Sequence, residues 1–143
     1  PLRRPPPPTL IRSRRQRQMC IRDRPRVFPV NSARAMRGAI FAEEHDRLVP
    51  WSRAVFEAYW GDDQDISQAA VLEALASKVG LDPAALLAAT DNPAYKQALR
   101  SNTDDLIERG GYGSPTMFIN GDDMYFGNDR LPLVEARLQQ LLG

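Results

Sequence analysis

The stretch from Gly110 to Arg130 constrains the fold more than any other part of the chain, because strand, turn and helix-start signals follow one another within it. A short apolar run at Thr116–Asn120 and a second at Met124–Phe126 flank Gly121–Asp123. Two short apolar runs separated by a glycine-containing turn are typical of a β-hairpin. The stretch therefore predicts a hairpin followed by the start of a helix.

A proline marks the entry to this hairpin. Pro115 has no amide hydrogen to donate to a sheet, which confines it to the first position of a strand, and the preceding Ser114 is restricted to extended backbone. Bonds before proline adopt the cis form at modest cost. Ser114–Pro115 is therefore a candidate cis bond, and a cis bond leaves the N–H and C=O of Ser114 facing outward, where a peptide-like molecule can pair with them as an added strand would.

Helical signals fill the chain between Val27 and Arg109. Apolar residues recur there at helical spacing, and asparagine, aspartate, proline and glycine stand where helix caps and stops are expected. The chain is therefore predicted to be mostly helical, with one hairpin. The predicted helices run from an Asn31 cap to Glu44, from Asp46 to Trp60, from Asp65 to Gly80, from an Asp82 cap through Pro83, from an Asn92 cap to Arg109, and from Gly127–Arg130 through Leu142.

Three features within or between the predicted helices have structural explanations. His45 is the only histidine and has no nucleophile nearby, so we expect it at a solvated helix end. The acidic group formed by Asp62, Asp63 and Asp65 lacks the loop spacing of a calcium site, and we predict no metal site. Aromatic residues at helical spacing are expected to pack in a core; they are Trp51, Phe56, Tyr59 and Trp60.

The first 26 residues differ from the rest in composition. They hold nine arginines, six prolines and one aspartate, with almost no periodic apolar residues, and such a segment cannot build a core. We predict that residues 1–26 are disordered. Because residues 15–24 resemble translated sequencing-adapter sequence, we interpret the segment as an assembly artefact. Natural disorder and a basic arm or targeting peptide are the alternatives.

Charge disfavours one class of partner. The chain has 19 basic and 18 acidic residues, but nine of the basic residues and one of the acidic residues lie in residues 1–26. The remainder holds ten basic and seventeen acidic residues, a formal charge near −7. An acidic domain is not expected to bind nucleic acid, and no apolar run is long enough to span a bilayer. We therefore expect a cytoplasmic protein that binds neither nucleic acid nor membranes.

Cysteine content excludes dithiol chemistry within the sequence. Cys20 is the only cysteine and lies in the atypical first segment. A single thiol forms no internal disulfide, no Cys-X-X-Cys pair and no thiolate zinc cluster. The sequence as it stands therefore cannot act alone as a dithiol oxidoreductase.

The order of Gly113–Thr116, a short hairpin and Gly127–Arg130 resembles the C-terminal half of a thioredoxin-type domain. Within that superfamily it is similar to the 2-hydroxychromene-2-carboxylate isomerases and kappa-class glutathione transferases, a branch of the DsbA-like proteins. Phe28–Ser32 followed by Ala35–Gly38 resembles the entry into that family's helical insertion.

The resemblance covers residues 27–142 and implies an α/β fold. It implies that residues 27–109 form a helical insertion domain and that residues 110–143 form the C-terminal half of a thioredoxin-like domain, a β-hairpin plus a helix. The family's N-terminal β-α-β half has no counterpart in this sequence, so the chain as present is mostly α. That half also carries the family's catalytic serine, or cysteine in oxidoreductases. The catalytic residue is therefore unknown, and we expect a fragment that is inactive alone.

The resemblance also implies that the peptide-like molecule at Ser114 is the thiol glutathione, that the substrate is a small aromatic compound, and that the chain forms a homodimer. It places glutathione at Ser114, Pro115, Asn128 and Asp129. The N–H groups at the start of the last helix attract a carboxylate, and the side chain of Asp129 can take the ammonium of a γ-glutamyl group. Helix capping alone is the alternative role of Asn128 and Asp129.

Three functions are left open. The first is a glutathione-dependent isomerase acting on aromatic-degradation intermediates similar to 2-hydroxychromene-2-carboxylate. The second is a DsbA-like thiol-disulfide oxidoreductase, for which a Cys-X-X-Cys pair outside this sequence would decide. The third is a non-catalytic helical binding fragment, which would fold alone and bind no thiol. We favour the first because of Gly127–Arg130 and the lack of paired cysteines.

Overall fold

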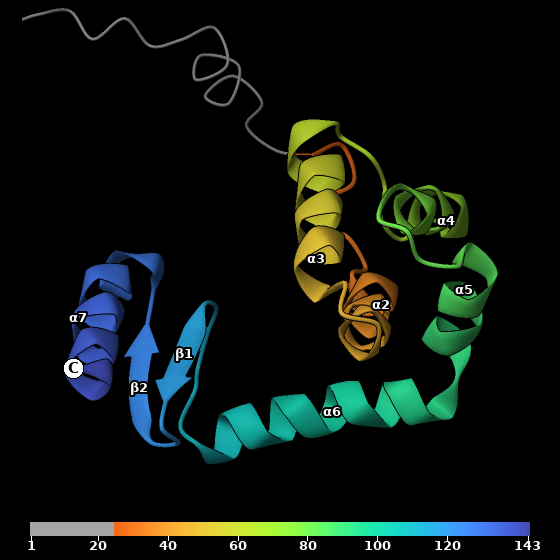
Figure 1. Ribbon diagram of the computed structural model, residues 1–143. Coiled ribbons are helices and arrows are strands. Elements are labelled where there is room, and N and C mark those ends of the chain that lie inside the picture. Colours follow the sequence, from red (N-terminus) through yellow and green to blue (C-terminus); the bar gives the residue numbers. More distant parts are fainter. Residues whose placement is uncertain (1–24) are drawn as a thin grey trace, which may run out of the picture. The chain divides into compact units, whose positions relative to one another are not determined.

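The computed structural model describes residues 25–143. These residues belong to two compact units, one ending at Asp91 and one spanning Asn92–Gly143, whose elements are labelled in Figure 1. Most of the predicted disordered segment, residues 1–26, lies outside the described part. The predicted division into residues 1–26, 27–109 and 110–143 stays a prediction.

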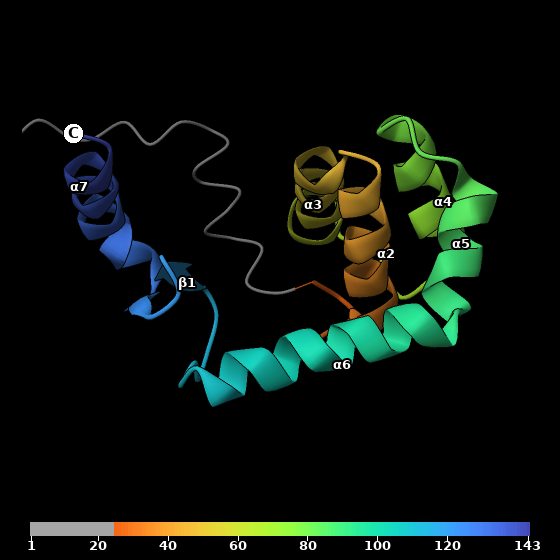
Figure 2. The ribbon, with the colours of Figure 1, turned by 60° about the horizontal axis from the view of Figure 1, so that its bottom comes forward.

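Helices build the described part of the first unit. Helix α2 (Ala33–Glu44) contacts α3 (Leu48–Phe56) and α5 (Pro83–Asp91), and α4 (Ala69–Lys78) contacts α3 and α5 as well. Figure 2 shows α2 between α3 and α5. A π-helical turn, η1 (Glu57–Gly61), continues α3. The four α-helices thus enclose a common apolar core.

Two predicted helix caps are confirmed. Asp82 Oδ1 accepts a hydrogen bond from the N–H of Ala85 at 2.9 Å at the start of α5. Asn92 Oδ1 accepts one from the N–H of Ala94 at 2.8 Å at the start of α6 (Pro93–Glu108). Such bonds satisfy amide groups that have no partner within the first turn. A proline follows each cap, where its missing N–H costs no helical hydrogen bond.

Helix α4 begins at Ala69 rather than at the predicted Asp65. The backbone N–H and the Oγ of Ser67 both donate to Asp65 Oδ1, at 3.0 and 2.6 Å, and Gln68 Nε2 donates to Asp65 Oδ2 at 2.9 Å. These bonds lower the pKa of the Asp65 carboxyl, with the Ser67 hydroxyl as the largest cause. An aspartate that binds its own local backbone favours a turn over a helix, so the helix starts after the turn.

Trp51 holds α2 and α3 together. Its side chain is 1% exposed, and its Nε1 donates to the carbonyl of Ala35 at 3.1 Å. Gly38 of α2 faces the same indole, and a Cβ built on Gly38 would lie 2.7 Å from Trp51 Cζ2. The close approach of the two helices therefore depends on the absence of a side chain at Gly38.

Two aromatic residues predicted to be buried are exposed instead. Phe56 and Trp60 are 65% and 53% exposed. At about 3.6 residues per turn, Phe56 lies about 140° around the helix from Trp51, so both cannot face α2. Of the four predicted aromatic core residues, Trp51 and Tyr59 are buried, and the prediction is wrong for Phe56 and Trp60.

The second unit contains the predicted hairpin. Strands β1 (Thr116–Ile119) and β2 (Asp123–Phe126) pair antiparallel, and α6 precedes them. The strand ends lie within one residue of the prediction. Asn120 and Gly121 in the turn have φ angles of 50° and 99°, a backbone region in which asparagine and glycine are common. A 3₁₀ turn, η2 (Asn128–Arg130), and helix α7 (Leu131–Leu142) follow.

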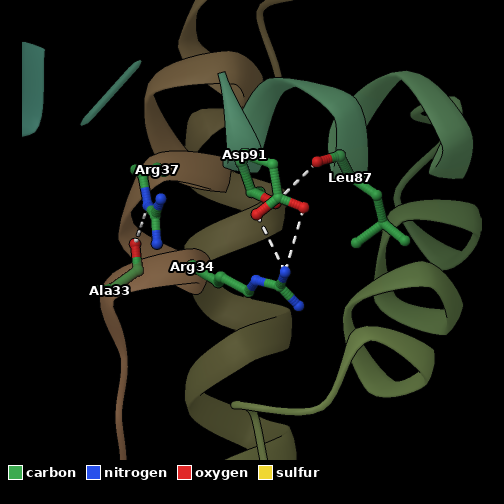
Figure 3. Close-up of polar contacts among 6 residues, drawn as sticks. Ala33, Arg34, Arg37, Leu87 and Asp91 are labelled. Atoms are coloured by element: carbon green, nitrogen blue, oxygen red, sulfur yellow. Dashed lines mark hydrogen bonds and ion pairs between the residues drawn. The ribbon is translucent and has the colours of Figure 1, made fainter. Parts of the chain in front are cut away.

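An ion pair joins α2 to the end of α5 (Figure 3). Arg34 Nη2 donates to both carboxylate oxygens of Asp91, at 2.9 and 3.1 Å. The neighbouring Arg37 turns back to its own helix, where its Nε donates to the carbonyl of Ala33 at 3.1 Å. Both members of the ion pair reach solvent, so we expect it to contribute little to stability.

We predict that Gly38→Ala lowers the free energy of unfolding by about 1–3 kcal/mol, because the new Cβ must displace the Trp51 ring from a packed core. Urea denaturation followed by circular dichroism measures the change. Gly61→Ala is the matched control, since a Cβ there meets no atom within 4 Å. An equal or greater stability of Gly38→Ala would show that the helices do not depend on this contact.

A double-mutant cycle of Arg34→Gln and Asp91→Asn should give a coupling energy of about 0.2–1 kcal/mol at low salt. High salt should reduce that coupling, because exposed charges are screened. Denaturation curves of the four proteins at two salt concentrations measure both quantities. A larger coupling that is insensitive to salt would contradict a solvent-exposed pair.

Candidate functional site

A hydrogen bond just past the ends of the two strands joins the chain segments that carry the predicted site residues. The N–H of Gly127 donates to the carbonyl of Pro115 at 3.0 Å. This bond continues the ladder by one step past the pair formed by Thr116 and Phe126. Ser114 therefore lies at the end of the hairpin from which the last helical segment begins. We call Ser114, Pro115, Asn128 and Asp129 the hairpin-end site.

Ser114 has backbone groups that the protein leaves open. The Ser114–Pro115 bond is cis, as predicted, and Ser114 is exposed. Within residues 25–143, neither the N–H nor the C=O of Ser114 has a hydrogen-bond partner. Backbone groups of this kind pair with water or with a ligand. The open groups of Ser114 are thus available to an extended peptide-like molecule.

Hydrogen-bond and ring contacts hold the loop that carries Ser114 in place. Thr116 Oγ1 donates to the carbonyl of Gly113 at 2.6 Å. The ring of Phe126 lies against Gly113, where a Cβ would come within 2.6 Å of Phe126 Cε2. The ring of Tyr112 also contacts Phe126, with 4.6 Å between the ring centroids. The loop is therefore packed on β2 immediately before it reaches Ser114.

Arg109 holds the other end of the hairpin. It was not predicted as a site residue. Its Nη2 donates to the carbonyl of Gly121 at 2.6 Å, and its Nη1 donates to Asp105 at 3.1 Å. Its guanidinium carbon lies 3.6 Å from the ring centroid of Phe118. The sequence does carry a signal for this role: Arg109 stands directly before the helix-ending pair Gly110–Gly111, and arginine side chains at helix ends often bind carbonyl groups.

Neither Asn128 nor Asp129 caps a helix. No side-chain capping bond is formed at the start of η2 or of α7. Asp129 is 71% exposed on its side chain, and its Oδ2 lies 3.6 Å from Arg130 Nε. Gly127 has a φ of 100°, and a Cβ there would lie 2.5 Å from Asp129 Oδ1. The absence of a side chain at Gly127 thus leaves room for the Asp129 carboxylate beside the start of η2.

A charged contact on the other strand joins β2 to α7. Arg137 Nε donates to Asp123 Oδ2 at 2.7 Å. The pKa of Tyr125 is raised, chiefly by burial and further by the hydrogen bond to Asp123 and its charge, while Arg137 acts in the opposite direction. This contact positions the last helix on the hairpin and leaves the hairpin-end site open.

Other candidate residues have structural roles. His45 ends α2, as predicted, with its Nδ1 2.8 Å from the carbonyl of Phe41. Asp63 accepts a hydrogen bond from the N–H of Arg26 at 2.8 Å and also pairs with the Arg26 side chain. Within the described range, no three metal-binding side chains converge. No described helix is long and apolar enough to cross a membrane.

Comparison with known proteins identifies the family of the chain. The family model of the DSBA-like thioredoxin domain matches residues 10–139. The 2-hydroxychromene-2-carboxylate isomerase of Pseudomonas putida is 31% identical over 119 residues, which are 82% of this chain and 58% of that protein. Glutathione S-transferase kappa 1 of Rattus norvegicus is 30% identical over 102 residues, which are 67% of this chain and 45% of that protein.

A solved structure of a 2-hydroxychromene-2-carboxylate isomerase superposes with a TM-score of 0.71 at 30% sequence identity, covering 89% of this chain and 63% of that one. The chain spans about half the length of the curated relatives it matches. The predicted fold class is confirmed: a thioredoxin-like DsbA fold, mostly helical, with a two-stranded sheet among the described residues. The family match over most of the sequence, together with this superposition, shows that the chain belongs to the family of DSBA-like thioredoxin domains.

Proposed function

We propose that the chain is part of a glutathione-dependent isomerase whose substrate is a bicyclic aromatic carboxylate similar to 2-hydroxychromene-2-carboxylate. The names of the isomerase relatives support the reaction and the substrate class, and the kappa-class relative supports glutathione. The observation that carries the proposal is the hydrogen bond from Gly127 to Pro115. It groups open backbone atoms and an exposed carboxylate at the hairpin-end site.

The residues of the hairpin-end site fit the chemistry of glutathione. Glutathione is a tripeptide, and the open N–H and C=O of Ser114 can pair with the backbone of its cysteinyl residue as an added strand does. Its γ-glutamyl end carries an ammonium and a carboxylate. The Asp129 carboxylate can accept from the ammonium, and the N–H groups at the start of η2 favour the carboxylate. Asp129 forms no capping bond, and its ion pair with the neighbouring Arg130 is exposed to solvent, so an ammonium group can approach its carboxylate.

The chain contributes binding and orientation to the reaction. Bound glutathione supplies a thiol that adds reversibly to an unsaturated substrate and so permits rotation about the former double bond. Ser114 pairs with the backbone of the cysteinyl residue and Asp129 with the γ-glutamyl ammonium, which positions the cysteinyl sulfur relative to the protein. The contact of Phe126 with Gly113 holds the loop that carries Ser114, and Arg109 holds the turn at the other end of the hairpin. The residue that activates the thiol is not assigned to any position of this sequence.

A thiol-disulfide oxidoreductase is the second candidate, because the matched family is the DSBA-like thioredoxin domain. Such an enzyme requires two cysteines within reach of each other, whereas Cys20 is the only cysteine of this sequence. A hairpin that binds glutathione needs no cysteine of its own. The isomerase is therefore the function that the residues of this chain support better.

We predict that Asp129→Ala weakens glutathione binding about three- to tenfold, since an exposed carboxylate facing an ammonium is worth less than a buried one. The unfolding free energy should change by less than about 0.5 kcal/mol, because Asp129 caps no helix. Calorimetric titration with glutathione and urea denaturation measure the two effects. Asp122→Ala, at an exposed aspartate of the hairpin turn, is the control with the same charge change.

A reversed result would assign Asp129 a structural role. If Asp129→Ala left the affinity for glutathione unchanged and lowered the stability, the ammonium would not lie at Asp129. If Asp129→Ala and Asp122→Ala weakened binding equally, the effect would come from the overall negative charge rather than from a contact.

A further inference from the structure

The outer edge of β1 carries a row of open backbone groups. The bond from Gly127 to Pro115 makes these two residues a hydrogen-bonded pair of the ladder, and such pairs alternate along antiparallel strands. In the observed register, Thr116 and Phe118 therefore point their N–H and C=O groups away from β2. Among residues 25–143, no other backbone group binds them. We call the outward backbone groups of Ser114, Thr116 and Phe118 the β1 edge.

The neighbours of the hairpin contact its two faces rather than this edge. Tyr112 and Gly113 lie against the ring of Phe126, so the loop before β1 passes over one face. Helix α7 contacts the hairpin through the bond from Arg137 to Asp123. Side chains three residues apart on a strand point to opposite faces, so α7 lies against the face opposite to Phe126. The β1 edge is thus accessible between the two faces.

Charge distinguishes the two strands of the hairpin. Residues 110–120, which include all of β1, contain no charged residue, whereas residues 121–130, which include β2, contain three aspartates and an arginine. Arg109, which lies over the Phe118 ring, is paired with Asp105. Charged side chains commonly protect edge strands from pairing with other chains, and β1 lacks them. Two copies of the chain can therefore approach along β1, whereas their aspartates would repel at β2.

A second hairpin would also stabilise the sheet. An isolated two-stranded hairpin is marginally stable in water, and three or more strands with an apolar face are needed for independent stability. In the part of the chain that the structure describes, β1 and β2 form a sheet of two strands. Helices α6 and α7 of the same unit have no buried residue. Pairing of two hairpins would double the number of strands in one sheet.

We propose that two copies of the chain pair antiparallel through their β1 edges and form a four-stranded sheet about a two-fold axis at Thr116. In this register Thr116 lies opposite Thr116 of the other copy, and Ser114 lies opposite Phe118 of the other copy. All outward N–H and C=O groups of the β1 edge are then paired. Threonine pairs across strands are favourable. The two-fold symmetry makes the contact self-complementary, so the assembly closes at the dimer.

The pairing covers the backbone groups of Ser114, so dimer formation competes with glutathione; this consequence rests on the proposed function. Because both copies must release glutathione, a concentration about ten times its dissociation constant should raise the dissociation constant of the dimer about a hundredfold. Sedimentation equilibrium with and without glutathione measures the change. If calorimetry shows glutathione bound but the dimer is not weakened, Ser114 lies outside the interface and the register is wrong. If glutathione does not bind and the dimer forms, the proposed function fails and the pairing stands.

Sedimentation equilibrium of the full chain at high salt tests the pairing itself. High salt screens attraction between the basic residues 1–26 and the acidic remainder, whereas backbone pairing should persist as a reversible monomer–dimer equilibrium. Thr116→Lys places like charges opposite each other and should weaken the dimer about two- to fivefold. Thr116→Val also lacks the bond to Gly113 and should retain the dimer. Met124→Lys, at an outward position of β2, is the matched control.

Several outcomes of the sedimentation experiment would overturn the proposal. They are a monomer at every concentration, association that disappears at high salt, and equal weakening by Thr116→Lys and Met124→Lys. Circular dichroism of each variant shows whether it is folded.

Disulfide cross-linking tests the position of the axis. The Cα atoms of a hydrogen-bonded antiparallel pair lie about 5.5 Å apart, a distance that a disulfide can bridge. With Cys20→Ser as the background, Thr116→Cys should form a covalent dimer on mild oxidation, and Met124→Cys should remain monomeric. Equal cross-linking of the two variants, or no cross-linking of Thr116→Cys, would show that the copies do not meet at Thr116.

Discussion

The hydrogen bond between the Gly127 amide and the Pro115 carbonyl is the contact on which the candidate site depends. The pairing of Thr116 with Phe126 brings Ser114 and the start of the last helical segment to the same end of the hairpin. With the bond from Gly127, the ladder reaches one step past the strands and leaves the next backbone groups, those of Ser114, open. The φ of 100° at Gly127 allows the chain to turn from β2 into η2 at this point. A side chain there would collide with the Asp129 carboxylate.

Local signals account for the features that the sequence predicted well. Pro115 and Gly121 determine where the hairpin begins and turns, and Asp82 and Asn92 bind the amide groups of the helices they precede. Each of these effects acts over a few residues, so it can be recognised without tertiary structure. The four residues of the hairpin-end site were predicted from a family resemblance, and their shared position at one end of the hairpin follows from the ladder. Their role in binding glutathione stays a proposal.

Features that depend on distant neighbours could not be read from spacing. Helical periodicity indicated that Trp51, Phe56 and Trp60 lie on apolar turns, but only the packing of α2 decided which side is covered. Arg109 binds the carbonyl of Gly121, twelve residues away; its place at a helix end indicates binding to a carbonyl group, but not to which one. The turn at Asp65 replaced a helix start because its carboxylate binds Ser67 and Gln68 at once. The exposure of two aromatic residues was therefore missed, although their spacing was visible.

Amide chemical shifts test most directly whether the hairpin end holds glutathione. In a ¹⁵N-labelled sample titrated with glutathione, the account predicts saturable shifts of the amides of Ser114, Asn128 and Asp129 with one common dissociation constant. Cysteinylglycine lacks the γ-glutamyl group, so it should shift Ser114 while leaving Asn128 and Asp129 nearly unchanged. Saturable shifts confined to other residues, or no shift at Ser114, would contradict the assignment of this hairpin end as the glutathione site.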